Sequence, residues 1–222
     1  MTAQDLKQKQ IFLVDDHPLV REWLGHLINQ QPDLAICGEA GDTISALREI
    51  RRISPDAIVV DISLGGSSGI ELIKEIKSTS PKVAILVLSM HEESTYVERA
   101  LRAGALGYVV KRETTKQIVS AIRKVLQGEY FLSDPLAVTM TRKFVETPQR
   151  TGAFPVDKLS DRELEIFEML GRGLETRTIA ETLHISMKTV QAYCARIKEK
   201  LHLMNATELL REAVLWSQRE AS

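Results

Sequence analysis

Five polar residues stand at the ends of short apolar runs that have the length and composition of buried strands. Asp15 and Asp16 come directly after IFLV, Asp61 closes AIVVD, Ser89 ends LVLS, and Lys111 follows GYVV. Three carboxylates in one crevice repel one another strongly unless a cation joins them. Carboxylate oxygens suit Mg²⁺, which binds one or two carboxylates together with phosphate oxygens. We therefore expect phosphoryl chemistry, with Asp61 as the nucleophile that forms an aspartyl-phosphate.

The hydroxyl and the ammonium group have matching roles in such chemistry. Lys111 supplies a positive partner for the phosphate, and the Ser89 hydroxyl hydrogen-bonds it, so Ser89 is drawn in only when phosphate is present. Each residue alone has an ordinary explanation, because an aspartate after a strand often caps the next helix and a lysine there is usually a solvated charge. Their occurrence together at the strand ends is what predicts a site.

The elements that must position these residues alternate along the first half of the chain. Expected strands, each rich in apolar and β-branched residues, are Ile11–Val14, Leu34–Ala40, Ala57–Ile62, Val83–Ser89 and Gly107–Val110. Expected amphipathic helices are Pro18–Gln30, Thr43–Ser54, Ile70–Ser80, Ser94–Ala103 and Thr115–Gln127. This alternation predicts a doubly wound, flavodoxin-like α/β unit with a five-stranded parallel sheet and a ligand crevice at the carboxyl ends of its strands.

The second half of the chain has a different pattern. Prolines, glycine and threonines between positions 131 and 157 indicate a linker that holds one short helix, Pro135–Val145. A purely helical unit follows, with helices expected from the capping box at Ser160 to Leu170, and over Thr176–Leu183, Met187–Leu201 and Asn205–Ser217. The short turn before the third of these helices is typical of a helix-turn-helix. We expect domains at 8–128 and 158–219, joined by a linker at 129–157.

Composition limits the alternatives. The 222 residues are 44% hydrophobic and 27% charged, which is typical of a globular protein. No apolar run approaches the roughly 18 residues that span a bilayer, and the polar N-terminus does not resemble a signal peptide, so we expect a cytoplasmic protein without a membrane partner. Cys37 and Cys194 are expected to be reduced thiols. Because the formal net charge is −1, any argument for nucleic-acid binding must rest on local charge.

Local charge indicates that the third helix of the C-terminal unit is the one that contacts DNA. Val190, Cys194, Ile197 and Leu201 are spaced as a core stripe, and the helix carries four basic residues against one glutamate. A basic helix of a helix-turn-helix is the one that enters a major groove. Gln191 suits adenine and the small alanines suit thymine methyl groups, while the basic side chains suit phosphates. The candidate DNA contacts are Lys188, Thr189, Gln191, Ala192, Ala195, Arg196, Lys198 and Lys200.

Residues from about Gln10 to Gln127 resemble the receiver domain of response regulators, with the acidic pair, the strand-end aspartate, the serine and the lysine in the family's order. The resemblance implies Asp61 as phosphoacceptor and Mg²⁺ as cofactor. It implies Asp16 and Asp61 as side-chain ligands, Ser63 as a backbone ligand and Asp15 as a ligand through water. It also implies Tyr108 as the aromatic residue that turns inward when Ser89 moves.

The loop after Asp61 departs from the receiver pattern, and the role of two histidines beside the crevice is open. Gly65 stands where the family usually has a proline, and Gly65 and Gly66 make the loop after Asp61 more flexible. His17 and His91 flank the crevice, either as surface histidines or as residues that set the rate of dephosphorylation.

Residues from about Lys158 to Ser217 resemble the LuxR-type helix-turn-helix of the NarL/FixJ class, through the pattern LSDRELEI, IAETL, ISMKTV and RIKEKL. His184 stands in the turn where the family usually has glycine. Histidine tolerates the left-handed backbone conformation better than most residues. Ala192, Tyr193 and Ala195 replace residues that relatives often carry, so the target sequence remains open.

Together these features predict a phosphorylation-dependent transcription factor rather than an enzyme. A sensor histidine kinase would phosphorylate Asp61, and a homodimer would then bind double-stranded DNA. The last helix carries Leu209, Leu210, Val214 and Trp216, which serve either a dimer surface or packing within the domain. Three rival functions are a DNA-binder with a vestigial pocket, a phosphatase or phosphotransferase with an aspartyl-phosphate intermediate, and a protein-interaction module that does not bind DNA.

Overall fold

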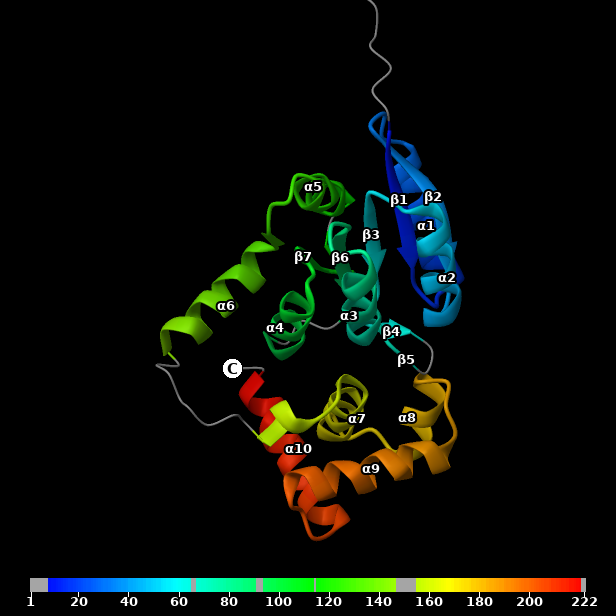
Figure 1. The fold of residues 1–222 in the computed structure, drawn as a ribbon. Coiled ribbons are helices and arrows are strands. Elements are labelled where there is room, and N and C mark those ends of the chain that lie inside the picture. Colours follow the sequence, from blue (N-terminus) through cyan, green and yellow to red (C-terminus); the bar gives the residue numbers. More distant parts are fainter. Residues whose placement is uncertain (1–7, 65–66, 91–93, 114, 147–154, 221–222) are drawn as a thin grey trace, which may run out of the picture. The chain divides into compact units, whose positions relative to one another are not determined.

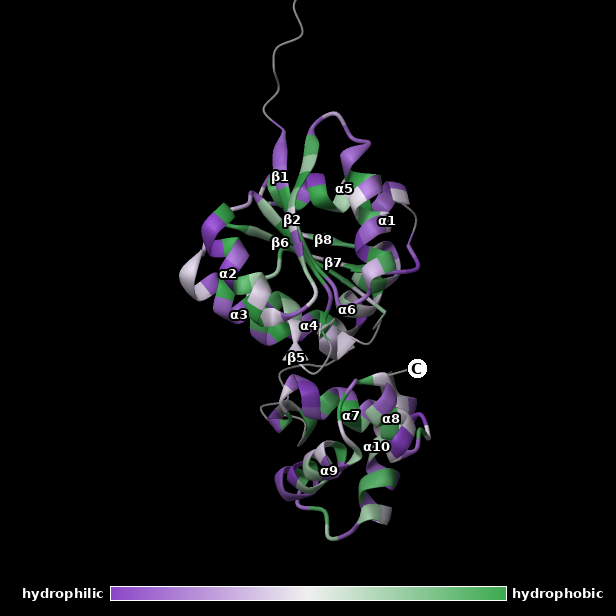
Figure 2. Ribbon diagram, turned by 90° about the vertical axis from the view of Figure 1, so that its right-hand side faces the viewer, coloured by the Kyte–Doolittle hydropathy of each residue, from purple (hydrophilic) through white to green (hydrophobic). Residues whose placement is uncertain are grey.

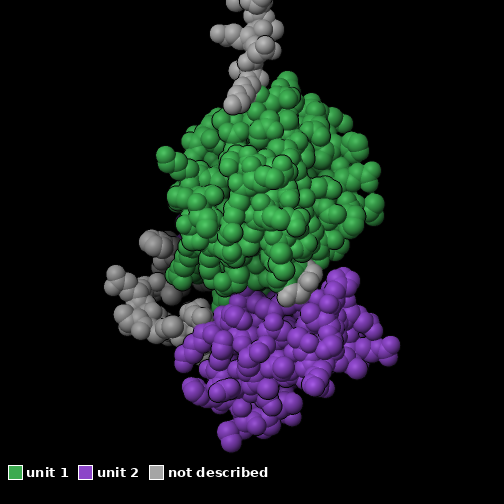
Figure 3. Space-filling view, turned by 45° about the vertical axis from the view of Figure 1, so that its right-hand side comes forward, with its two compact units in different colours: residues 1–140 green, residues 141–222 purple. Residues whose placement is uncertain are grey.

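The computed structural model of the chain describes residues 8–64, 67–90, 94–113, 115–146 and 155–220 (Figure 1). The chain divides into two compact units, residues 1–140 and 141–222, which are coloured separately in Figure 3.

The first unit is built on a parallel sheet whose strands lie in the order β2-β1-β3-β6-β7-β8. The five long strands are β1 (Lys9–Val14), β2 (Leu34–Ala40), β3 (Ala57–Val60), β6 (Ala84–Ser89) and β7 (Gly107–Val110). All their pairings are parallel, and β3 and β6 are buried along their whole length. The predicted doubly wound sheet is thereby confirmed. The continuous apolar runs in the sequence arise because these strands are covered on both faces.

Helices cover both faces of the sheet (Figure 2). The helices are α1 (Pro18–Asn29), α2 (Thr43–Ile53), α3 (Gly69–Thr79), α4 (Ser94–Ala103) and α5 (Thr115–Leu126). Helices α1 and α5 share one core with alternate residues of the central strands, including Ile11, Leu13, Val59 and Leu86. Helices α2, α3 and α4 lie on the other face, where α3 contacts both α2 and α4.

The sheet has a sixth strand that the sequence pattern did not predict. Strand β8 (Phe131–Leu132) pairs in parallel with β7, in the register Gly107↔Phe131. Two residues are too few for a hydrophobic period to be recognised, so tertiary pairing alone defines this strand. A two-stranded antiparallel hairpin, β4 (Ser63–Leu64) and β5 (Ser67–Ser68), precedes α3. Helix α6 (Asp134–Glu146) corresponds to the helix expected within the linker.

The second unit is helical, as expected. After the 3₁₀ turn Pro155–Lys158 come α7 (Asp161–Gly171), α8 (Thr176–Thr182), α9 (Met187–Leu201) and α10 (Ala206–Glu220). The Ser160 and Glu163 capping box is present, with both reciprocal hydrogen bonds formed. Helix α10 packs on α7 through Phe167 and Trp216, whose ring centroids lie 6.0 Å apart. None of the helices in the described part of the chain has the length and apolar character needed to cross a bilayer.

Candidate phosphorylation site and DNA-binding helix

Backbone hydrogen bonds bring the predicted site residues to one edge of the sheet. The amide of Asp61 donates to the carbonyl of Val14 at 2.8 Å, which holds the residue after β3 beside the end of β1. The amide of Lys111 donates to the carbonyl of Ser89 at 2.7 Å, which joins the ends of β7 and β6 in the same way. The prediction that separate strand ends converge is therefore a direct consequence of parallel pairing.

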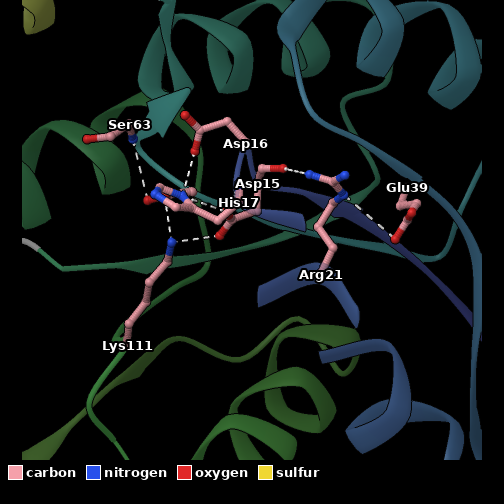
Figure 4. A network of polar contacts seen from close by, with 8 residues as sticks. Asp15, Asp16, His17, Arg21, Glu39, Ser63 and Lys111 are labelled. Atoms are coloured by element: carbon pink, nitrogen blue, oxygen red, sulfur yellow. Dashed lines mark hydrogen bonds and ion pairs between the residues drawn. The ribbon is translucent and has the colours of Figure 1, made fainter. Parts of the chain in front are cut away.

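Lys111 joins two of the carboxylates in a buried ion-pair network (Figure 4). Its Nζ atom lies 2.6 Å from Oδ2 of Asp15 and 2.7 Å from Oδ2 of Asp61. The side chains of Asp15, Asp61 and Lys111 are 4%, 5% and 11% exposed, so water screens these charges weakly. Asp16 adds a third carboxylate to the cluster, beyond the two that contact Lys111.

Burial and neighbouring charge act against each other on both central groups, and the pKa values of Asp61 and Lys111 are both raised. Burial raises the pKa of Asp61 to about 6, although Lys111 opposes this shift by favouring the carboxylate. Burial alone lowers the pKa of Lys111, but the adjacent Asp61 and Asp15 carboxylates outweigh it and raise that pKa above its ordinary value. A carboxylate that is poorly solvated and still ionised at neutral pH is suited to act as a nucleophile.

The acidic residues fit a hard divalent cation. One oxygen from each of Asp15, Asp16 and Asp61 lies, together with a ring nitrogen of His17, within 4.8 Å of the other ligand atoms. Clustered oxygen donors of net negative charge are what Mg²⁺ prefers. The amide of Ser63 lies 3.4 Å from Oδ1 of Asp61, so the loop that carries the expected backbone ligand follows the phosphoacceptor closely. Gly65, Gly66 and His91 lie outside the described residues.

The two predicted switch residues are both buried. Ser89 ends β6 and Tyr108 lies on β7, and each is 0% exposed. Tyr108 pairs in register with Val87, two residues before Ser89 on the neighbouring strand. Their roles in a switch stay a prediction. The pairing of β6 with β7 places the two residues on neighbouring strands.

Two further residues shape the acidic loop and were not predicted from the sequence. The Nη1 atom of Arg21 on α1 donates to the carbonyl oxygen of Asp15 at 2.5 Å, and its Nε lies 3.8 Å from Glu39 (Figure 4). Gly69 packs so closely on the site that a Cβ atom there would lie 1.9 Å from the carbonyl oxygen of Asp61. A glycine that begins a helix after a serine N-cap was a weak signal, and Arg21 had none.

Helix α9 presents most of the predicted DNA-contacting residues to solvent. Val190 and Ile197 are buried and Cys194 and Leu201 are half-buried, which confirms the core stripe. The exposed candidates are Lys188, Gln191, Ala192, Ala195 and Arg196, while Thr189, Lys198 and Lys200 are half-buried. The turn before α9 contains His184 with φ of 52°, the left-handed conformation expected where relatives have glycine.

Some of these candidates already have partners within the domain. The Nζ atom of Lys200 lies 2.6 Å from Oε2 of Glu163, and Nε of Arg196 lies 3.7 Å from Oε1 of the same residue. The guanidinium of Arg196 also lies over the ring of Tyr193, 4.3 Å from its centroid. Ser186 is the N-cap of α9, and its Oγ accepts a hydrogen bond from the Thr189 amide at 3.1 Å and lies 2.8 Å from the Thr189 hydroxyl. Lys188 lies at the exposed start of the helix.

Both halves of the chain match known families, and the chain has relatives along nearly its whole length. Residues 11–123 match the response regulator receiver domain, and residues 157–213 match the bacterial regulatory proteins of the luxR family. The oxygen regulatory protein NreC of Staphylococcus epidermidis is 32% identical over 210 residues, which cover 92% of this chain and 96% of that protein. NreC of Staphylococcus aureus is 33% identical over 209 residues, with the same shares covered.

Solved structures agree with this assignment. A LuxR-family two-component response regulator from Aurantimonas is 37% identical, with a TM-score of 0.61 over 63% of this chain and 99% of that one. The RcsB response regulator of Salmonella typhimurium shares the fold at 21% identity, with a TM-score of 0.63 over 93% of this chain and 97% of that one. The chain belongs to the response regulators of the NarL/FixJ class, and it is a phosphorylation-dependent transcription regulator with a receiver domain and a LuxR-type DNA-binding domain.

Proposed function

We propose that Asp61 accepts a phosphoryl group from the phosphohistidine of a sensor histidine kinase. A carboxylate oxygen of Asp61 attacks the phosphorus atom, the phosphorus–nitrogen bond breaks, and the histidine leaves with its electron pair and takes up a proton. The observation that carries this proposal is the buried contact of 2.7 Å between Asp61 and Lys111, which supplies a nucleophile and a cation for the incoming phosphate.

Mg²⁺ is the proposed cofactor. Asp16 and Asp61 would hold it through their side chains, Ser63 through its carbonyl group, and Asp15 through a water molecule. When bound, the ion neutralises negative charge on the transferred phosphoryl oxygens. The three carboxylates outnumber the single ammonium group of Lys111, and this excess of negative charge supports a divalent cation at the site.

Phosphorylation then changes the surface of the receiver through Ser89 and Tyr108. The hydroxyl of Ser89 moves to hydrogen-bond the phosphate, and the aromatic ring follows. Ser89 and Tyr108 lie on neighbouring, hydrogen-bonded parallel strands, so a movement of one side chain changes the surroundings of the other.

We place the receiver at 8–128, the linker at 129–157 and the DNA-binding domain at 158–219. The protein acts in the cytoplasm and does not turn over an external substrate.

The output is binding to double-stranded DNA as a homodimer, with α9 in the major groove. The exposed Lys188, Gln191 and Ala192 at the start of α9 support this placement, because the first turns of a recognition helix meet the base edges. Thr189, Ala195, Arg196, Lys198 and Lys200 complete the proposed contact set.

Fluorescence anisotropy with labelled promoter duplexes tests the proposed coupling. The full chain is titrated onto DNA with and without acetyl phosphate and Mg²⁺, beside Asp61→Asn as the matched control. We expect the phosphodonor to tighten binding by the wild-type protein and to leave Asp61→Asn unchanged. Equal tightening of both proteins would rule out Asp61 as the phosphoacceptor.

A further inference from the structure

His17 lies at the rim of the acidic pocket and has no role in the proposed phosphoryl transfer. Its Nδ1 atom lies 2.7 Å from Oδ1 of Asp16 and 3.2 Å from Oδ1 of Asp15. The His17 side chain is 61% exposed, whereas that of Asp15 is 4% exposed. The pocket therefore combines three carboxylates with one imidazole nitrogen, and all four ligand atoms lie within 4.8 Å of one another.

The backbone holds His17 at this rim. Pro18 begins α1, and a residue before proline is disfavoured in the helical region, which agrees with the extended φ of −91° and ψ of 109° at His17. The amide of His17 also donates to Oδ1 of Asp15 at 2.8 Å. The main chain thus fixes the position of the residue, and its exposed ring contacts the two carboxylates from the rim of the pocket.

This donor set differs from one made for Mg²⁺ alone. Mg²⁺ prefers oxygen ligands, whereas imidazole nitrogen suits Zn²⁺, Co²⁺ and Ni²⁺. Ligand atoms about 2.0–2.2 Å from a tetrahedral Zn²⁺ ion stand about 3.3 Å apart. The nitrogen of His17 already lies 2.7 and 3.2 Å from two of the carboxylate oxygens, so a small outward movement of the exposed ring would admit such an ion.

We propose that His17 is a ligand for a zinc-like divalent cation in this pocket, together with Asp15, Asp16 and Asp61, and that such an ion blocks phosphorylation. The inference rests on the proposed function, because it concerns the same pocket. Four protein ligands close the coordination shell of Zn²⁺, as in structural zinc sites, and leave no position for a phosphoryl oxygen. Asp61, held as a ligand, is then no longer available as a nucleophile.

A simpler role for His17 is that of a positive partner for the acidic pair. The two roles predict opposite results for His17→Gln. If the imidazole is a ligand, its loss weakens zinc binding and affects magnesium binding much less. If it is only a competing cation, its loss strengthens binding of both ions in parallel, because both ions then meet a more negative pocket.

The first experiment measures Zn²⁺ and Mg²⁺ affinities of the tag-free full chain at a fixed pH, with a chelating indicator as competitor for zinc. The variants are His17→Gln and, as a matched control, His26→Gln, which removes an exposed histidine of α1 that lies near Glu22. We expect His17→Gln to weaken zinc binding about tenfold or more, to lower the zinc-to-magnesium affinity ratio, and His26→Gln to change neither. An unchanged ratio in His17→Gln would overturn the inference.

The second experiment follows Mg²⁺-dependent labelling of Asp61 by acetyl phosphate while Zn²⁺ is added. We expect stoichiometric zinc to stop labelling of the wild-type protein and His17→Gln to need a higher zinc concentration. Equal zinc sensitivity of the two proteins would overturn the inference and leave the phosphoacceptor assignment intact. Absence of labelling with Mg²⁺ alone would instead contradict the proposed function, and the affinity ratio would still decide the role of His17.

Discussion

The ammonium group of Lys111 and the carboxylate of Asp61 form a contact of 2.7 Å at the centre of the receiver, where both side chains are nearly inaccessible to water. The same ammonium group lies 2.6 Å from Asp15. Lys111 thus occupies oxygens that a divalent cation would also attract, and it is positioned to meet a phosphate on Asp61.

Replacing Lys111 with methionine should strengthen Mg²⁺ binding severalfold, because the variant removes a positive charge from the ion's immediate surroundings. Phosphorylation should become slower at saturating Mg²⁺, because the phosphate loses its partner. Isothermal titration measures the first effect, and the rate of labelling by acetyl phosphate measures the second. Lys111→Arg, which keeps the charge, is the control. Weaker Mg²⁺ binding by Lys111→Met would contradict this account of the network.

Asp61→Asn should stabilise the metal-free protein at pH 7.5 by about 1–3 kcal/mol. The pKa of Asp61 is raised from 3.8 to about 6 in the folded protein, mainly by burial, so its ionised form opposes folding above pH 6. The penalty is lost as the pH falls from 6 to 4, and the difference between the two proteins should shrink over that range. Thermal unfolding in EDTA measures it. A variant less stable than wild type at pH 7.5 would count against the buried charge.

Gly69→Ala should destabilise the receiver by about 1–3 kcal/mol and weaken Mg²⁺ binding, because the new methyl group would collide with the main chain of Asp61. Gly25→Ala on α1 is the matched control. Apart from its chain neighbours and the backbone of its own helix, no atom lies within 4 Å of the added Cβ, and the change should stabilise the chain by about 0.4–1 kcal/mol. Urea unfolding of both variants checks the prediction. Unaltered stability and Mg²⁺ affinity in Gly69→Ala would show that the contact has no importance.

Lys188→Ala should weaken binding to duplex DNA of arbitrary sequence. It should also reduce the slope of log affinity against log salt concentration by about one, because one phosphate contact is lost. Lys200→Ala should have a smaller effect, because in the free protein Lys200 is already 2.6 Å from Glu163 and must leave that partner to reach a phosphate. Anisotropy titrations at several salt concentrations compare the two variants. Equal losses would mean that the ion pair with Glu163 opens without penalty when DNA binds.

Most of the fold could be predicted from the sequence because the strands and helices follow strong local patterns. The predicted boundaries of α4 and α9 agree with the structure, those of α1 and α2 differ by one residue at one end, and those of α3 differ by one residue at each end. Strand β8 was missed because two residues carry no periodicity, and only pairing with β7 makes them a strand. Helix α3 begins at Gly69 rather than Ile70, since the Ser68 side chain accepts hydrogen bonds from the first turn.

The site was predictable where chemistry follows from strand order and was not where it depends on packing. Asp15, Asp61 and Lys111 converge because parallel strands end at one edge. The hydrogen bond from Arg21 to the Asp15 carbonyl depends on how α1 packs against the sheet. The pairing of Lys200 with Glu163 likewise depends on how α9 packs against α7. Charge and spacing alone assigned Lys200 to a phosphate and gave no sign of this internal partner.

Intact-mass spectrometry after incubation with acetyl phosphate tests whether Asp61 takes up a phosphoryl group in the presence of Mg²⁺. The measurement compares the wild-type chain and Asp61→Asn, each with and without Mg²⁺. We expect a single phosphate adduct on the wild-type protein that requires Mg²⁺ and is absent from Asp61→Asn. An adduct of equal yield on Asp61→Asn, or none on folded wild-type protein with Mg²⁺ present, would contradict it.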